Sequence, residues 1–327
     1  MPSCLGPTIR RAISVAGVLF LGLAALAESP VLMLENEHLR LGLSQSDGRL
    51  VQFTDRKANW NHIADQADPL GLWKLELLRN GQSVDLTPAQ AKSFQLERGR
   101  GAGTVRLSWS DFNIEGMKQL KVVVDAQLEP GWAMSRWNIT VQNQGDLVLE
   151  KLHFPQFPAI RPQPDEWLAV PVWMGQLAAN PRALLRAAPG KEKRLEWDYP
   201  GLTSLQCLAF YRRNGPGLYF SCDDTASFRK SFVLSGTGEE QVRYEMVHMP
   251  ETREAATYRL PYQAILGAFQ GDWFTAADHY RSWATNQAWA RESRLASHLT
   301  PDWAVETGMW VWNRGRSSNV LEPAIAL

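Results

Sequence analysis

The feature that most constrains this chain is a two-residue hydrophobic period that recurs along most of its length. Leu39, Leu41 and Leu43 alternate with polar or small residues before a Ser-Asp-Gly turn, and residues 137–142 alternate before Asn-Gln-Gly. A period of two places the apolar side chains of a strand on one face, and frequent turns between such segments are typical of antiparallel sheets. The pattern therefore predicts a mainly β protein, with a large antiparallel two-sheet sandwich over residues 28–270.

The composition is that of a protein with a large folded core. Of the 327 residues, 45% are hydrophobic and 21% are charged, which excludes a disordered chain. The 34 Lys and Arg residues are balanced by 34 Asp and Glu residues, so the basic excess that nucleic-acid binding needs is missing. Fourteen tryptophans stand out, because an indole ring suits both a large core and the apolar face of a sugar ring. We therefore expect no nucleic-acid partner and keep carbohydrate as the candidate ligand.

The first 27 residues have the organisation of a secretory signal peptide. Arg10 and Arg11 precede the apolar run 12–27, which ends in an Ala-Leu-Ala cleavage pattern. The run is shorter than the ~20 residues of a membrane-spanning helix. We therefore expect cleavage before Glu28, export to the periplasm or the exterior, and no membrane span in the mature chain.

Two cysteines remain after that cleavage, and export permits a disulfide between them. Cys207 and Cys222 flank two apolar runs joined by Asn214-Gly215, which predicts a hairpin. A symmetric turn would place the two cysteines opposite each other, whereas a change of register by one residue would put them on opposite faces. The sequence leaves a disulfide and two buried free thiols equally open.

The hydrophobic period changes near the C-terminal end of the chain. Trp273, Ala276 and Tyr280 follow a helical spacing after Asp272, a good N-cap residue. We therefore expect a linker helix and connector over residues 271–301. Residues 302–327 show an apolar run, a polar turn and the start of an amphipathic helix, which predicts the first strand and partial first helix of a further domain.

Most catalytic and metal-binding motifs are absent from the sequence. The six histidines lack the spacing of zinc ligands, and no G-x-S-x-G motif occurs, so we expect no metal and no cofactor. Asp223 and Asp224 follow a strand, where an Asx turn is the simpler interpretation. Trp197 beside Asp198 is a candidate sugar contact, because an exposed indole next to a carboxylate can hold a sugar, although the pair could also cap a sandwich edge. His153 and His248 are the histidines that a mutarotase-like epimerase would have to use.

Several short segments together resemble a known family. They are the Tyr199-Pro200-Gly201 turn, the Gly217-Leu218-Tyr219 strand followed by Asp224 and Lys230, and the segments HFPQFPAI, GDWFTAADHYRSWA and WVWNRG. This combination resembles an uncharacterised family of secreted bacterial glycoside-hydrolase-like proteins. The resemblance implies an N-terminal β-supersandwich similar to galactose mutarotase, a helical linker, and a (β/α)8 barrel that carries the chemistry.

The expected function follows from this resemblance and from the barrel. The chain would be the non-catalytic N-terminal portion of an exported carbohydrate-active protein, inactive by itself; the alternative is a stand-alone carbohydrate-binding or surface-attachment module. Active sites of such barrels lie at the carboxyl ends of the strands. If residues 309–312 form the first barrel strand, then Trp312, Asn313 and Arg314 lie at that end and are candidate sugar-binding residues. The sequence does not indicate an oligomeric state.

Overall fold

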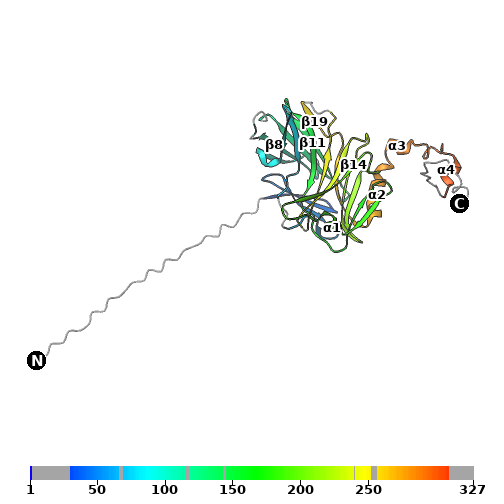
Figure 1. Ribbon diagram of the computed structural model, residues 1–327, viewed down its shortest axis with the longest axis horizontal. Coiled ribbons are helices and arrows are strands. Elements are labelled where there is room, and N and C mark those ends of the chain that lie inside the picture. Colours follow the sequence, from blue (N-terminus) through cyan, green and yellow to red (C-terminus); the bar gives the residue numbers. More distant parts are fainter. Residues whose placement is uncertain are drawn as a thin grey trace.

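Three antiparallel sheets make up the fold (Figure 1). The computed structural model describes Met1 and residues 30–308, except 66–68, 113, 115–117, 143–144, 239 and 252–255. Residues 2–27 of the expected signal segment and the expected barrel strand at 309–312 therefore lie outside the described residues. In the part that is described, no helix is long and apolar enough to cross a membrane.

The largest sheet has ten strands. Its order is β13-β12-β15-β16-β20-β10-β9-β8-β7, and β19 pairs with β10 beside β20. Its strands are β7 (Ala91–Arg98), β8 (Thr104–Phe112), β9 (Lys121–Leu128), β10 (Met134–Gln142), β12 (Glu166–Val170), β13 (Gln176–Ala179), β15 (Cys207–Arg212), β16 (Gly215–Cys222), β19 (Thr257–Arg259) and β20 (Ala264–Gly271).

A six-stranded sheet faces it, and a smaller sheet lies at the N-terminal end. The six strands, in spatial order, are β14 (Glu192–Tyr199), β17 (Lys230–Thr237), β18 (Gln241–His248), β11 (Val148–Phe157), β5 (Lys74–Arg79) and β6 (Gln82–Leu86). The four-stranded sheet consists of β1 (Val31–Glu35), β2 (Leu39–Ser44), β3 (Leu50–Asp55) and β4 (Trp60–Asn61).

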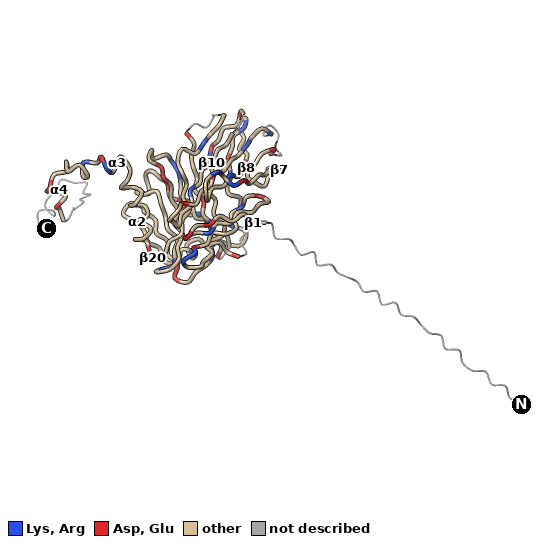
Figure 2. The backbone as a smooth tube through the Cα atoms, turned by 180° about the vertical axis from the view of Figure 1, so that it is seen from behind, with Lys and Arg blue, Asp and Glu red and all other residues tan. Residues whose placement is uncertain are grey.

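The helices are short and lie outside the sheets. They are η1 (Pro88–Gln90), α1 (Pro181–Leu185), α2 (Trp273–Ala284), α3 (Ala288–Arg291) and α4 (Asp302–Glu306). In Figure 1, α3 and α4 lead away from the sandwich. Figure 2 gives the opposite view, in which charged positions are spread over the outer strands.

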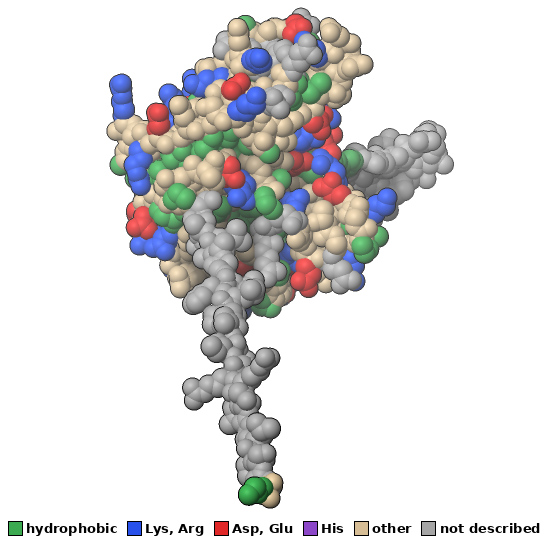
Figure 3. Space-filling view, turned by 90° about the vertical axis from the view of Figure 1, so that its left-hand side faces the viewer, with side chains coloured by type: hydrophobic (Ala, Val, Ile, Leu, Met, Phe, Trp, Pro, Cys, Tyr) green, Lys and Arg blue, Asp and Glu red, His purple; other side chains and the backbone are tan. Residues whose placement is uncertain are grey.

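One hydrophobic core fills the space between the two larger sheets. Phe220 of β16 stacks on Tyr244 of β18 with ring centroids 3.8 Å apart, and Phe157 of β11 contacts Phe220 edge-on. Leu75, Phe232 and many other inward side chains of both sheets are fully buried in the same cluster. Apolar side chains also reach the surface, where Figure 3 shows them as a band with Lys and Arg along its edges. The predicted sandwich is confirmed, and the four-stranded sheet is an addition that the sequence did not indicate.

Helix α2 packs on the outer face of the ten-stranded sheet. Asp272 caps it by accepting a hydrogen bond from the backbone N–H of Phe274 at 2.9 Å, as its residue type predicts. Ala276 and Tyr280 pack on apolar side chains of β15, β16 and β20. Trp273, which the helical spacing placed on the buried stripe, is 46% exposed. The linker helix expected within residues 271–301 ends at Ala284, and the short α3 and α4 follow it.

Candidate functional sites on the outer sheet faces

Trp197 and Asp198 lie on opposite faces of one strand. They are neighbours on β14, so their side chains point to opposite faces of the sheet. Trp197 is half-buried and packs on the core. The Asp198 carboxylate accepts a hydrogen bond from Ser231 Oγ at 2.7 Å. The expected loop is a strand, so the two residues do not face the same side, and a sugar contact of either one stays a prediction.

The cysteines are two buried free thiols. Cys207 lies opposite Ser221 in the β15–β16 hairpin, one residue away from Cys222. The side chains therefore point to opposite faces: Cys207 packs beneath α2, and Cys222 packs in the central core. Burial raises the pKa of both thiols to about 12, so neither is a reactive thiolate. The structure thus decides against the disulfide that the sequence left open.

Trp312, Asn313 and Arg314 lie outside the described residues, so their role stays a prediction. Asp224, by contrast, makes the expected Asx turn: its carboxylate accepts from the backbone N–H groups of Ala226 and Phe228. The same carboxylate pairs with Lys230, whose side chain is completely buried. This part of the family resemblance therefore corresponds to a buried ion pair.

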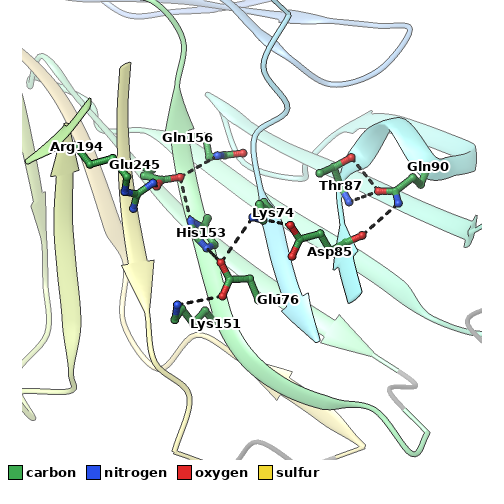
Figure 4. A network of polar contacts seen from close by, with 10 residues as sticks. All are labelled: Lys74, Glu76, Asp85, Thr87, Gln90, Lys151, His153, Gln156, Arg194 and Glu245. Carbon is green, nitrogen blue, oxygen red and sulfur yellow. Dashed lines mark hydrogen bonds and ion pairs between the residues drawn. The ribbon is translucent and has the colours of Figure 1, made fainter. Parts of the chain in front are cut away.

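A polar cluster lies on the outer face of the six-stranded sheet (Figure 4). At its centre is His153 of β11, whose Nδ1 lies 3.0 Å from Glu245 of β18 and whose Nε2 lies 3.0 Å from Glu76 of β5. A bulge in the pairing of β11 with β18 lets Gln156 also donate to Glu245, at 3.0 Å. Because both ring nitrogens face carboxylate oxygens, hydrogen bonds on both sides need a ring with two protons.

Cations surround both carboxylates of this cluster. Lys151 lies 3.1 Å from Glu76, and Arg194 lies 2.8 Å from Glu245. Burial raises the pKa of Glu245, but the hydrogen bond and charge of His153 and the charge of Arg194 outweigh it and lower the pKa to about 2. Burial also raises the pKa of Glu76. The hydrogen bonds from Lys151 and His153 outweigh this effect, so the pKa of Glu76 is lowered. A general acid for glycoside hydrolysis needs a raised pKa, so neither carboxyl group is suited to that role.

His248 does not provide an alternative acid or base. The residue is only 1% exposed. Its Nδ1 contacts the Tyr262 hydroxyl at 2.7 Å, and its Nε2 contacts the Phe154 carbonyl at 2.6 Å. Burial is the largest influence on its pKa, which is lowered to about 3. The ring is therefore a neutral core side chain without access to a substrate.

The outer face of the ten-stranded sheet is hollowed in two places that adjoin. A hollow of about 710 Å³ and another of about 520 Å³ share Glu97, Arg106, Asp125 and Arg259 in their walls, so they form one depression, which we call the β7–β10 groove. Arg106 binds Asp125 through two hydrogen bonds of 2.7 and 3.1 Å across β8 and β9.

A third hollow, of about 350 Å³, lies between this sheet and α2. Trp132, on the turn between β9 and β10, is 48% exposed at this hollow, and its ring contacts that of His279 on α2. Arg136 pairs there with Glu129 at 2.6 Å and with Asp223. Arg136 also lines the β7–β10 groove, so the two hollows share this residue as a wall.

Sequence reasoning singled out none of the groove residues. The sandwich was predicted as a whole, but the outward polar positions of β7, β8, β9 and β19 come together only through strand pairing. For His153 the sequence supplied the residue but not its partners. Within the described ranges, no group of three or more His, Cys, Asp or Glu side chains could hold a metal ion.

Comparison with known proteins finds one family match and several solved structures with a similar fold. Residues 258–327 match a family described as a domain of unknown function, DUF6259. No curated protein matches the chain. An α-N-acetylgalactosaminidase from Bifidobacterium bifidum, solved with GalNAc, superposes with a TM-score of 0.57 at 12% identity over 79% of this chain and 39% of that one. A galactose mutarotase-like protein from Lactobacillus casei superposes with a TM-score of 0.48 at 10% identity, over 73% of this chain and all of that one.

The match to the galactosaminidase concerns the fold. Its complex with Gal-NHAc-DNJ superposes equally well, with a TM-score of 0.58 over the same shares of the two chains. This chain therefore spans about two fifths of the length of the galactosaminidase that it matches.

Proposed function

We propose that this chain is the non-catalytic sandwich portion of an exported, glycoside-hydrolase-like protein that acts on oligo- or polysaccharides. The observation that carries the proposal is the fold shared with the α-N-acetylgalactosaminidase from Bifidobacterium bifidum. The alignment covers 39% of the chain of that enzyme. In this proposal residues 1–27 direct export, 28–270 form the sandwich domain, 271–301 connect, and 302–327 begin a (β/α)8 barrel. The catalytic acid and nucleophile would belong to that barrel.

The chemistry of the described residues supports a non-catalytic sandwich. The most enclosed group of acids and a histidine, around His153, has both carboxylates neutralised by cations and their pKa values lowered. The His153 side chain is 6% exposed, which leaves little room for a sugar against the ring. A mutarotase-like epimerase, which needs a histidine and a carboxylate facing its substrate, is therefore less well supported.

A stand-alone carbohydrate-binding module is the second candidate. The β7–β10 groove favours it, because the groove is a polar depression on a rigid sheet and needs no further domain to be complete. Both candidates agree that the sandwich itself performs no hydrolysis.

The barrel candidates remain part of the first proposal. Trp312, Asn313 and Arg314 would line a sugar subsite at the carboxyl end of the first barrel strand. An Arg314→Ala substitution in the complete protein should then lower activity or glycan affinity roughly ten- to a hundredfold, the loss expected for a hydrogen bond to a charged group. Unchanged activity and affinity at an unchanged melting temperature would remove Arg314 from the site.

The experiment that tests the proposed function is a search for activity in the purified chain. We expect no release of nitrophenol from a panel of aryl glycosides and no acceleration of the anomeric interconversion of galactose or glucose in polarimetry. Hydrolysis that disappears in a folded Glu76→Gln, Glu245→Gln variant would contradict the proposal. Interconversion that disappears in His153→Asn, but not in the matched variant His38→Asn at a partly exposed position, would favour the epimerase instead.

A further inference from the structure

The outer face of β7, β8, β9, β10 and β19 presents polar side chains in rows across the strands. Strand pairing aligns Glu97, Arg106, Asp125 and Asn138 in one row. The next row contains Gln95, Ser108, Val123, Thr140 and Arg259. With a spacing of ~4.8 Å between strands, five strands give a face ~19 Å wide, which exceeds the size of one sugar ring. An antiparallel sheet commonly has one polar face; this one is also hollowed into the β7–β10 groove.

The groove carries an excess of positive charge in a chain whose net charge is zero. Six cations line it against two acids, and in Figure 2 blue positions lie along β7, β8 and β10. The cations are Arg98, Arg100, Arg106, Lys121, Arg136 and Arg259, and the acids are Glu97 and Asp125.

Only two of the six cations have a carboxylate partner within the described part of the chain. Arg106 is paired with Asp125, and Arg136 is paired with Glu129 and Asp223. Arg98 donates to the carbonyl of Met33 and Arg259 to the amide oxygen of Asn138, contacts that neutralise no charge. Arg100 and Lys121 have no ion pair among the described residues. Arg98 alternates with Glu97 along β7 and pairs with the buried Val105, so its side chain points away from the outer row. Arg100, Lys121 and Arg259 thus face the groove without an ion pair among the described residues, together with Glu97, the amide of Gln127 and the hydroxyl groups of Ser108 and Thr140.

We propose that the β7–β10 groove binds an acidic glycan chain. Carboxylate or sulfate groups of the glycan would pair with Arg100, Lys121 and Arg259, and its hydroxyl groups would exchange hydrogen bonds with the amide and hydroxyl side chains between them. The choice of a glycan among polyanions rests on the proposed function. The charge, the shape and the length of the groove are observations of this chain alone.

The experiment compares acidic glycans with their uncharged counterparts. Isothermal titration calorimetry of the purified chain would use oligogalacturonates against fully methyl-esterified oligogalacturonates, and sulfated against desulfated heparan oligosaccharides. We expect at least one acidic member to bind roughly tenfold or more tightly than its counterpart, with affinity that falls as salt rises, because salt screens exposed charges. Equal binding of charged and uncharged partners, or no binding by either acid, would overturn the proposal.

Variants assign the site. Lys121→Gln with Arg259→Gln should lower the affinity for the acidic glycan roughly tenfold or more, whereas Lys193→Gln, an exposed lysine of β14 on the other sheet, should leave it unchanged. An equal loss of affinity in the control and in the groove variant would place the glycan elsewhere. An unchanged affinity in both variants would lead to the same conclusion.

The choice of a glycan has its own test. Single-stranded DNA of matched charge that binds as tightly as the acidic glycan would show a general polyanion site and refute the glycan assignment. Hydrolysis by the purified chain would refute the proposed function and leave the groove intact, so the two failures can be told apart.

Discussion

At the scale of single residues, the sandwich is notable for a lysine buried in its core. The Lys230 ammonium contacts the Asp224 carboxylate and lies 2.9 Å from Gln206 Oε1. It also lies over the rings of Tyr199 and Tyr262, at 4.7 and 4.5 Å from their centroids. These contacts compensate for the loss of water around both charges, so the pair ties the Asp224 turn to β17.

Removal of one partner of this ion pair should be strongly destabilising. Lys230→Met would leave the Asp224 carboxylate buried and unpaired, and we expect the free energy of unfolding to fall by about 3–5 kcal/mol. Urea unfolding measures the change, and Lys193→Met, which alters an exposed lysine, is the control. Adding Asp224→Asn should recover part of the loss. A double variant less stable than the single one would show that the turn, rather than the charge pair, dominates.

At the scale of elements, α2 depends on its cap and on two buried side chains. Asp272 satisfies one backbone N–H of the first turn, and Ala276 and Tyr280 are the buried residues of the helix. Since α2 forms one wall of the hollow beside Trp132, its position also fixes His279 at that surface.

Loss of the cap should loosen this helix. Asp272→Ala should lower the free energy of unfolding by about 1 kcal/mol, while Asp272→Ser keeps a capping oxygen and should stay near the wild-type value. Amide hydrogen exchange over α2 should accelerate in the alanine variant. Equal stability and exchange in both variants would mean that packing alone holds the helix.

At the scale of the whole molecule, buried histidines make stability depend on pH. His62 is 1% exposed, and its ring has no hydrogen-bond partner in the part of the chain that the structure describes. Burial lowers its pKa to about 3, and burial is also the main reason that the pKa of His248 is about 3. Both rings are therefore neutral in the folded protein over a pH range in which the unfolded chain binds protons.

Stability should consequently fall on mild acidification. The unfolded chain takes up two protons near pH 6.5 that the folded chain accepts only near pH 3. The contribution of the two neutral histidines to the free energy of unfolding is therefore complete above pH 6.5 and is lost between pH 6.5 and 3. Between these two pH values the free energy of unfolding should fall by about 2.7 kcal/mol per pH unit, because each of the two protons contributes about 1.4 kcal/mol per pH unit. Below pH 4.5, protonation of Glu245 should add to the loss, because its folded pKa is about 2.

Urea unfolding between pH 7.5 and 4.5 measures this slope. His62→Leu should halve it, and His38→Gln, at a partly exposed position, is the control. A stability that stays constant between pH 7 and 5 would contradict the assignment.

The sequence alone determined those features that depend on neighbours along the chain. Alternation of Leu39, Leu41 and Leu43 predicted a strand, because side chains on a strand alternate with period two whatever the strand packs against. Asp272 and Asp224 were predicted as a helix cap and a turn, because short polar side chains bond to backbone groups two to four residues away.

Only the tertiary structure decided what depends on register and on strand order. A shift of one residue in the β15–β16 hairpin separated Cys207 from Cys222, and local pattern does not fix a shift of that size. His153 meets partners 77 and 92 residues away, and Arg259 reaches the groove through its pairing with β10. Alternation marks which side chains face outward, but the order of strands in a sheet decides which of them meet, and that order is set by the packing of the whole core.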